Sequence, residues 1–150
     1  MTDIDTSTFV TTGGITVLPL ETPTLGDRSY LVHDGEVAFV VDPQRDIDRV
    51  LDLLDAQGAR LTHVLESHIH NDYVTGGLAL ARRTSAAYLV NAEDHVSFER
   101  TPVRDGQVIE VGGRSGAQSV DASASSGARL RRKLGTNLTV SPARLGARSR

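Results

Sequence analysis

An unbroken apolar run, Val-Ala-Phe-Val-Val at residues 37–41, constrains the fold of this chain more than any other feature. A run without polar alternation is typical of a strand covered on both faces, and Asp42 and Pro43 end it because proline cannot continue strand pairing. Residues 47–54 then carry apolar side chains at i, i+3, i+4 and i+7, which predicts an amphipathic helix ending at Gly58. A doubly covered strand followed by such a helix indicates layered α/β packing.

The neighbouring segments continue this alternation. Strand-like segments occur at residues 15–20, 29–33, 60–66, 87–90 and, more weakly, 108–111, and a short helix is expected at 78–83. The order of strand pair, strand, helix, strand, helix and strand predicts a mixed sheet with flanking helices.

The composition changes near residue 113. Residues 1–114 carry a net charge of −9, whereas residues 115–150 carry +6 and are rich in Ser, Ala, Arg and Gly. The second segment has too few large apolar side chains to offset an ordering entropy of about 1–2 kcal/mol per residue. We therefore predict one domain at residues 1–113 and a disordered, basic, low-complexity tail at 114–150.

Several classes of protein are excluded by composition. The chain contains no cysteine, which excludes disulfides and thiolate ligands and leaves histidines and carboxylates as the plausible ligands for a metal. Residues 1–12 lack the pattern of an export signal, and no run of 18 apolar residues occurs. We expect a cytoplasmic protein that does not associate with membranes.

A short polar motif follows the predicted strand at 60–66. His68, His70 and Asp72 bring two imidazoles and a carboxylate within five residues, which is a set that can hold a metal ion. The strand would deliver them to a sheet edge, and Gly76 with Gly77 would let the backbone turn tightly into the next helix. The pattern predicts a metal site.

The sequence around this motif, Val-Leu-Glu-Ser-His-Ile-His-Asn-Asp-Tyr-Val-Thr-Gly-Gly at residues 64–77, resembles the metal-binding signature of the metallo-β-lactamase superfamily. That signature reads His-x-His-x-Asp-His after a strand. The resemblance covers about residues 14–112 and is nearest to the branch of persulfide dioxygenases and glyoxalase II-like thioesterases. It implies an incomplete αββα sandwich, a mixed sheet with flanking helices, to which the disordered tail is added. It also implies possible self-association or association with a rhodanese domain.

The resemblance assigns roles to individual residues. It matches His68 and His70 to the histidines of the first metal site, and Asp72 to the carboxylate that binds metal or orients the catalytic water. Tyr73 stands where the signature has a further histidine, and a phenol with an ordinary pKa of about 10 is a poor ligand at neutral pH. We therefore expect one divalent ion, Fe(II) or Zn(II). Zinc implies thioester hydrolysis, whereas iron implies oxidation of a persulfide, in both cases on a small glutathione-type thiol derivative.

The downstream ligands of that family are absent. The family supplies a third histidine roughly fifty residues later, then an aspartate and another histidine, whereas the five histidines here are at positions 33, 63, 68, 70 and 95. We expect impaired activity and hypothesise that a reading-frame shift near Gly113 joined half of such an enzyme to a non-native tail. Half a sandwich would leave Phe39, Val41 and Leu89 without cover.

Other polar residues have simpler interpretations. His33 and His63 are expected to pack or cap locally, and His95 to lie in a solvated loop, although it could substitute as a ligand. Asp42 is expected to form a turn. Glu66 is either a support for the histidines or an ordinary charge at the end of a strand.

Three functions therefore compete. The first is a metal-dependent enzyme of this superfamily, and the second is a non-catalytic metal- or partner-binding module or inactive fragment. The third is a nucleic-acid or membrane-surface binder that uses the basic tail residues Arg129, Arg131, Arg132 and Lys133. Because the tail has no aromatic residue for base stacking, we expect no specific nucleic-acid partner.

Overall fold

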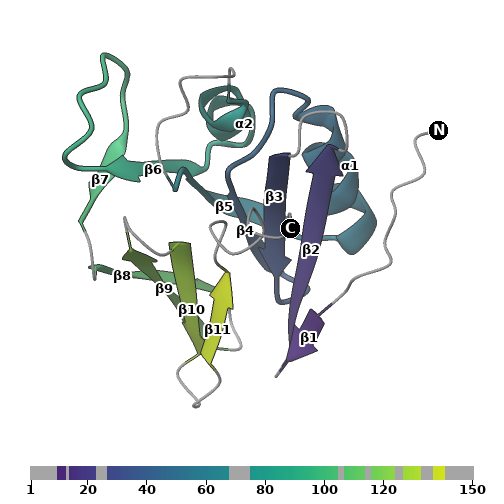
Figure 1. Cartoon of the computed structure of the whole chain (residues 1–150). Helices are drawn as coiled ribbons and strands as arrows, with labels where there is room; N and C mark the ends of the chain where they lie inside the picture. Colours follow the sequence, from purple (N-terminus) through teal and green to yellow (C-terminus); the bar gives the residue numbers. More distant parts are fainter. Residues whose placement is uncertain are drawn as a thin grey trace, which may run out of the picture.

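The structure is a computed structural model, and it describes residues 10–12, 14–22, 27–67, 75–104, 107–113, 116–123, 127–132 and 137–140 (Figure 1). The elements, in chain order, are β1 (Val10–Thr12), β2 (Ile15–Thr22), β3 (Asp27–His33), β4 (Val37–Val41), α1 (Asp48–Gln57), β5 (Arg60–Leu65), α2 (Gly77–Thr84), β6 (Ala87–Asn91), β7 (Thr101–Val103), β8 (Gln107–Gly113), β9 (Gly116–Ser123), β10 (Gly127–Arg132) and β11 (Asn137–Val140).

Two sheets organise these elements. The first has seven strands in sequence order, β1 to β7, with antiparallel pairing from β1 to β4 and parallel pairing from β4 to β7. The second has four antiparallel strands in the order β11, β10, β9, β8. The predicted mixed sheet is confirmed. Parallel pairing needs crossover connections, and α1 and α2 supply the first two of them.

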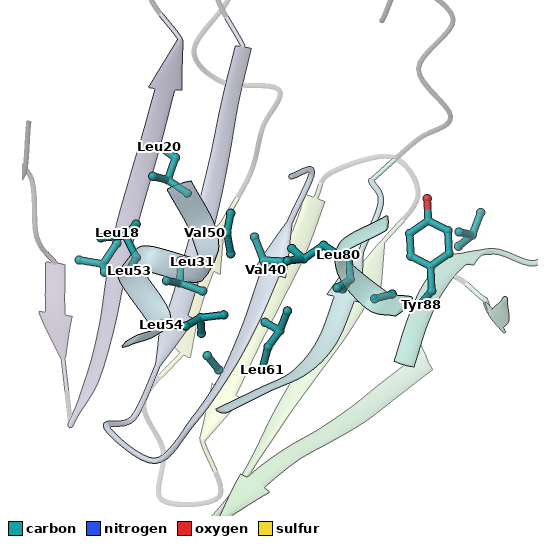
Figure 2. Close-up of a cluster of buried hydrophobic side chains, with 14 residues drawn as sticks. Leu18, Leu20, Leu31, Val40, Val50, Leu53, Leu54, Leu61, Leu80 and Tyr88 are labelled. Carbon is teal, nitrogen blue, oxygen red and sulfur yellow. The ribbon is translucent and has the colours of Figure 1, made fainter. Parts of the chain in front are cut away.

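Helix α1 forms where the apolar spacing predicts it. It ends at Gly58, whose φ of 64° is left-handed and whose N–H bonds to the carbonyls of the last turn. Its buried side chains are Val50, Leu53 and Leu54, so the buried face is rotated slightly from the predicted one. Figure 2 shows these side chains gathered against the sheet, where they pack with Leu18 and Leu31.

The central sheet is covered on both faces, because alternate side chains of its strands enter two different clusters. Val40 packs with α1 and α2, whereas Phe39 and Val41 pack on the opposite face with Val111 of β8. The layers are therefore helices, seven-stranded sheet and four-stranded sheet, as expected for an incomplete αββα sandwich.

The expectation that half a sandwich leaves apolar positions uncovered is wrong. Phe39, Val41 and Leu89 are 2%, 0% and 3% exposed. The cover comes from β8, since Val111 is buried in their cluster and Ile109 packs against it.

The basic tail also differs from its prediction. We expected residues 114–150 to be disordered, whereas β9, β10 and β11 pair antiparallel within 116–140. Residues 116–140 contain no proline, so every residue there can donate to a ladder whatever its side chain. The remaining tail residues lie outside the described part of the chain.

Among the described residues, no helix is both long and apolar enough to cross a membrane.

Candidate metal-binding site

The predicted motif follows strand β5 in the sequence, and β5 ends at one edge of the sheet. Strands β4, β5 and β6 are parallel, so their carboxyl ends lie at the same edge, where Asp42, Glu66 and Asn91 follow or end them. The motif residues His68, His70 and Asp72 lie outside the described residues, so their role as metal ligands stays a prediction. The structure does describe both flanks of their segment, up to Ser67 and again from Thr75.

Asp42 anchors the first flank. It follows the buried strand β4 with a φ of 49°, a left-handed conformation that Asp adopts more readily than most residues. Its Oδ1 accepts the Ser67 backbone N–H at 2.7 Å and its Oδ2 accepts the Ser67 hydroxyl at 2.6 Å. The Ser29 hydroxyl donates to the Asp42 carbonyl at 2.6 Å. Asp42 is thus the turn residue that we expected, and its carboxylate also fixes the residue before His68.

Glu66 and Thr75 join the two flanks to each other. The Thr75 hydroxyl contacts Glu66 Oε1, lies 3.1 Å from the Pro43 carbonyl oxygen and accepts the Gly77 N–H at 3.0 Å. A hydroxyl has one proton, so it donates to one of the two acceptors at a time. The contact joins the two residues that flank the segment containing the motif, Glu66 before it and Thr75 after it. Glu66 therefore supports this segment, and it is more than a charge at the end of a strand.

Tyr88 completes this buried polar group. Its hydroxyl donates to Glu66 Oε1 at 3.1 Å. Burial, together with the nearby Glu66 carboxyl group, raises the pKa of the Tyr88 phenol well above its ordinary value. The phenol therefore remains a proton donor at any physiological pH. Sequence reasoning missed Tyr88 and Thr75 because they lie 22 and 9 residues from Glu66.

Gly76 and Gly77 are required for a different reason from the one that the sequence suggested. Gly76 has a φ of −82°, which any residue adopts, so it is not required for a tight turn. A Cβ on Gly76 would lie 2.0 Å from the Gln44 carbonyl oxygen, and a Cβ on Gly77 would lie 2.1 Å from Glu66 Oε1. Both glycines permit close approach, so the start of α2 lies against the residues that follow β4 and β5.

Three other histidines are described by the structure. Two of them have local polar contacts, and the third is exposed. His33 is buried and its Nδ1 accepts the Gly35 N–H at 3.1 Å, whereas His63 is half-buried and its Nδ1 lies 2.9 Å from the Thr62 hydroxyl. Burial lowers the pKa of both imidazoles. His95 is exposed. Within the described ranges, no group of three or more histidines and carboxylates could hold a metal ion.

Comparison with known proteins gives the family. Residues 23–138 match the profile of the Metallo-beta-lactamase superfamily, so the match both begins and ends later in the chain than the 14–112 of the sequence resemblance. The chain is 37% identical over 84 residues to a hydroxyacylglutathione hydrolase of Methylobacillus flagellatus, covering 56% of this chain and 33% of that protein. It is 34% identical over 96 residues to a hydroxyacylglutathione hydrolase of Acidiphilium cryptum, covering 62% and 39%.

Solved structures agree with these relatives. ETHE1 from Myxococcus xanthus superposes with a TM-score of 0.61 at 25% identity, covering 77% of this chain and 53% of that one. A metallo-beta-lactamase from Staphylococcus aureus superposes with a TM-score of 0.65 at 24% identity, covering 79% and 39%. The chain spans between one third and two fifths of the two hydroxyacylglutathione hydrolases named above. With its fold, its motif position and the profile match in agreement, the chain belongs to the metallo-β-lactamase superfamily.

Proposed function

We propose that this chain binds one divalent metal ion through His68, His70 and Asp72 and takes part in hydrolysis of a glutathione-type thioester. One observation carries the proposal. The segment between Ser67 and Thr75 is fixed at both ends, by Asp42 and by Glu66, at the carboxyl edge of three parallel strands. A ligand loop needs such fixed ends, because ligand geometry decides metal affinity.

The donor set suits zinc or ferrous iron. Neutral imidazoles at 68 and 70 bind borderline cations, and the carboxylate of Asp72 either completes the ligand set or holds a water by hydrogen bonding. The metal would supply Lewis-acid activation of a carbonyl group and of water. Three ligands from one loop hold a metal less firmly than a closed set that includes distant residues. We therefore propose exchangeable binding and slow turnover for this chain.

The relatives favour a thioester. Two of them are named hydroxyacylglutathione hydrolases, and hydroxyacylglutathione joins an acyl group to the thiol of glutathione. We propose the same substrate class for the site of this chain: an acyl thioester of a small thiol.

A second reaction, oxidation of a glutathione persulfide by dioxygen and water to glutathione and sulfite, is favoured by two observations. The sequence around the motif resembles the branch of the superfamily that includes the persulfide dioxygenases. Tyr73 replaces the histidine that a second metal would need. A single ferrous ion would suit that ligand set.

Metal titration and two turnover assays test these proposals. Calorimetric titration of the whole chain with zinc, and with ferrous iron under nitrogen, is expected to give one site that His68→Ala abolishes. His95→Ala is the matched control and is expected to bind like the wild type. Equal binding by the wild type and His68→Ala would overturn the metal site.

Turnover then separates the reactions. Release of free glutathione from an acyl-glutathione by the zinc-loaded chain, lost in His68→Ala, supports hydrolysis. Oxygen uptake with sulfite formation from glutathione persulfide by the iron-loaded chain supports the second reaction. If neither rate exceeds that of His68→Ala, the chain is a metal-binding module without this catalysis.

A further inference from the structure

A cavity of about 290 Å³ lies on the helix side of the central sheet, between α2, the start of β6 and residues 99–101. Three residues of α2 line it, together with the turn into β6 and the first two residues of that strand, and none of the described residues that line it is a predicted metal ligand. The volume is at the small end of the range for ligand pockets. It could hold a compact organic molecule.

The cavity combines an apolar wall with two cations. Leu78, Ala81 and the Tyr88 ring form part of the wall, while Arg82 and Arg100 line the same space. An apolar wall with a few polar groups is the usual construction of a small-molecule site. The wall is also rigid, since the Tyr88 ring packs against Phe98 with ring centroids 5.7 Å apart and its hydroxyl bonds to Glu66.

The two guanidinium groups retain unused donors. Arg100 is held in place by Nη2, which donates to the Asp94 carbonyl at 2.9 Å and more weakly to the Ala92 carbonyl at 3.4 Å. Its Nε is buried and has no hydrogen-bond partner. Among the described residues, neither Arg82 nor Arg100 forms an ion pair, although Glu99 also lines the cavity. The buried Nε of Arg100 is not accessible from the cavity, so an oxyanion there would act as a counter-ion and acceptor for the other N–H groups of the two guanidinium groups.

The charges favour an anion with one negative charge. Two arginines and Glu99 give the lining a net charge of about +1, and the carbonyl groups at the end of α2 reduce the positive potential further. A dianion such as phosphate would be poorly compensated. We propose that this cavity binds a small monocarboxylate with an apolar body, its carboxylate against Arg82 and Arg100 and its apolar part against Leu78, Ala81 and the Tyr88 ring.

Benzoate is a suitable probe, because it joins one carboxylate to a compact apolar ring. Titration of the whole chain, by calorimetry or by NMR shifts, is expected to give saturable binding that Arg82→Ala weakens about tenfold, the loss for one charge-assisted hydrogen bond. Arg83→Ala is the matched control, since Arg83 is also in the last turn of α2 but does not line the cavity. It is expected to change binding less than twofold.

Three further measurements make the test decisive. Arg82→Lys is expected to restore part of the affinity, because it restores the charge without the planar donor pair. Acetate is expected to bind more weakly than benzoate, because it has little apolar body. Arg100→Ala removes the second cation. If that variant does not fold, Arg82→Ala still tests the site, because Arg82 lies at an exposed position of the helix. The proposal is overturned if benzoate does not saturate, if inorganic phosphate binds more tightly, or if Arg83→Ala weakens binding as much as Arg82→Ala.

Discussion

At the scale of single residues, a few buried polar groups fix the position of the candidate site. Asp42 turns the chain at the end of β4 and reaches Ser67, which is 25 residues later. Its position before a proline at a strand end predicts the turn. The partner of its carboxylate could not be predicted, because nothing local in the sequence tells which neighbouring strand end supplies it.

Replacing Asp42 tests this anchor. Asp42→Ala removes two short, partly buried hydrogen bonds between a carboxylate and Ser67, so it is expected to lower the free energy of unfolding by about 3 kcal/mol. Urea denaturation followed by circular dichroism measures this loss. Asp46→Ala, at an exposed position of the same connection, should cost less than about 0.5 kcal/mol. Equal losses in the two variants would contradict the anchoring role.

His33 predicts how stability depends on pH. Burial lowers its pKa from the ordinary value of 6.5, with a smaller opposing effect of Asp34, and its Nδ1 must be unprotonated to accept the Gly35 N–H. Below pH 6.5 the unfolded chain therefore binds more protons than the folded one. The stability that His33 contributes is complete above pH 6.5 and is lost as the pH falls toward its lowered folded-state pKa.

A pair of variants isolates this effect. His33→Asn keeps an acceptor for the Gly35 N–H but cannot be protonated, so its free energy of unfolding is expected to fall less than that of the wild type between pH 7.5 and about pH 5.5. Urea denaturation at the two pH values measures the difference. His95→Asn, at an exposed position, should keep the wild-type pH dependence. If His33→Asn does the same, His33 does not cause the acid sensitivity.

At the scale of elements, periodic apolar patterns made most of the fold predictable. The segments at 37–41 and 47–54 form β4 and most of α1 because burial requires their spacing. Strand β7 was missed because three residues show no period, and β9 to β11 were missed because their mostly polar or small side chains include too few large apolar residues to give a pattern. Their pairing depends on peptide groups, which composition does not reveal.

Helix α2 provides a test of close approach between elements. Gly76→Ala would place a Cβ 2.0 Å from the Gln44 carbonyl oxygen and 2.7 Å from Ile47 Cγ2, so α2 would have to move away from the start of α1. We expect a loss of about 3 kcal/mol in the free energy of unfolding. Gly58→Ala is the control, because nothing lies within 4 Å of its Cβ and only its left-handed φ of 64° is strained.

An alanine at position 58 in this left-handed conformation is expected to lower the free energy of unfolding by about 1 kcal/mol. Chemical denaturation of both variants measures the contrast. A Gly76→Ala variant as stable as Gly58→Ala would mean that the start of α2 does not lie against the residues that follow β4, and the explanation given for the glycine pair would be wrong.

At the scale of the whole molecule, the second sheet decides whether the central sheet has two covered faces. Strand β8 buries Val111 against Phe39 and Val41, and β9 is the strand that pairs with β8. Disorder beyond residue 113, which the composition predicts, would remove that pairing and leave β8 without a ladder. A paired segment and a disordered segment beyond residue 113 give opposite expectations for the exchange rates of the backbone amides.

Hydrogen exchange distinguishes them. Strand β9 lies between β8 and β10, so its amides are expected to exchange far more slowly than those of an unstructured chain, whereas β11, at the edge, exchanges faster. Val120 is the informative position, because it pairs with Ile109 on one side and with Leu130 on the other.

Val120→Pro removes a ladder donor from an internal strand and is expected to destabilise the chain by about 3 kcal/mol and to abolish protection in β8 as well. Mass spectrometry of peptides covering 107–113 and 116–123 gives both readouts. If residues 116–123 exchange fully within seconds in the wild type, the four-stranded sheet does not form. The cover over Phe39 would then have to come from another part of the chain or from another molecule.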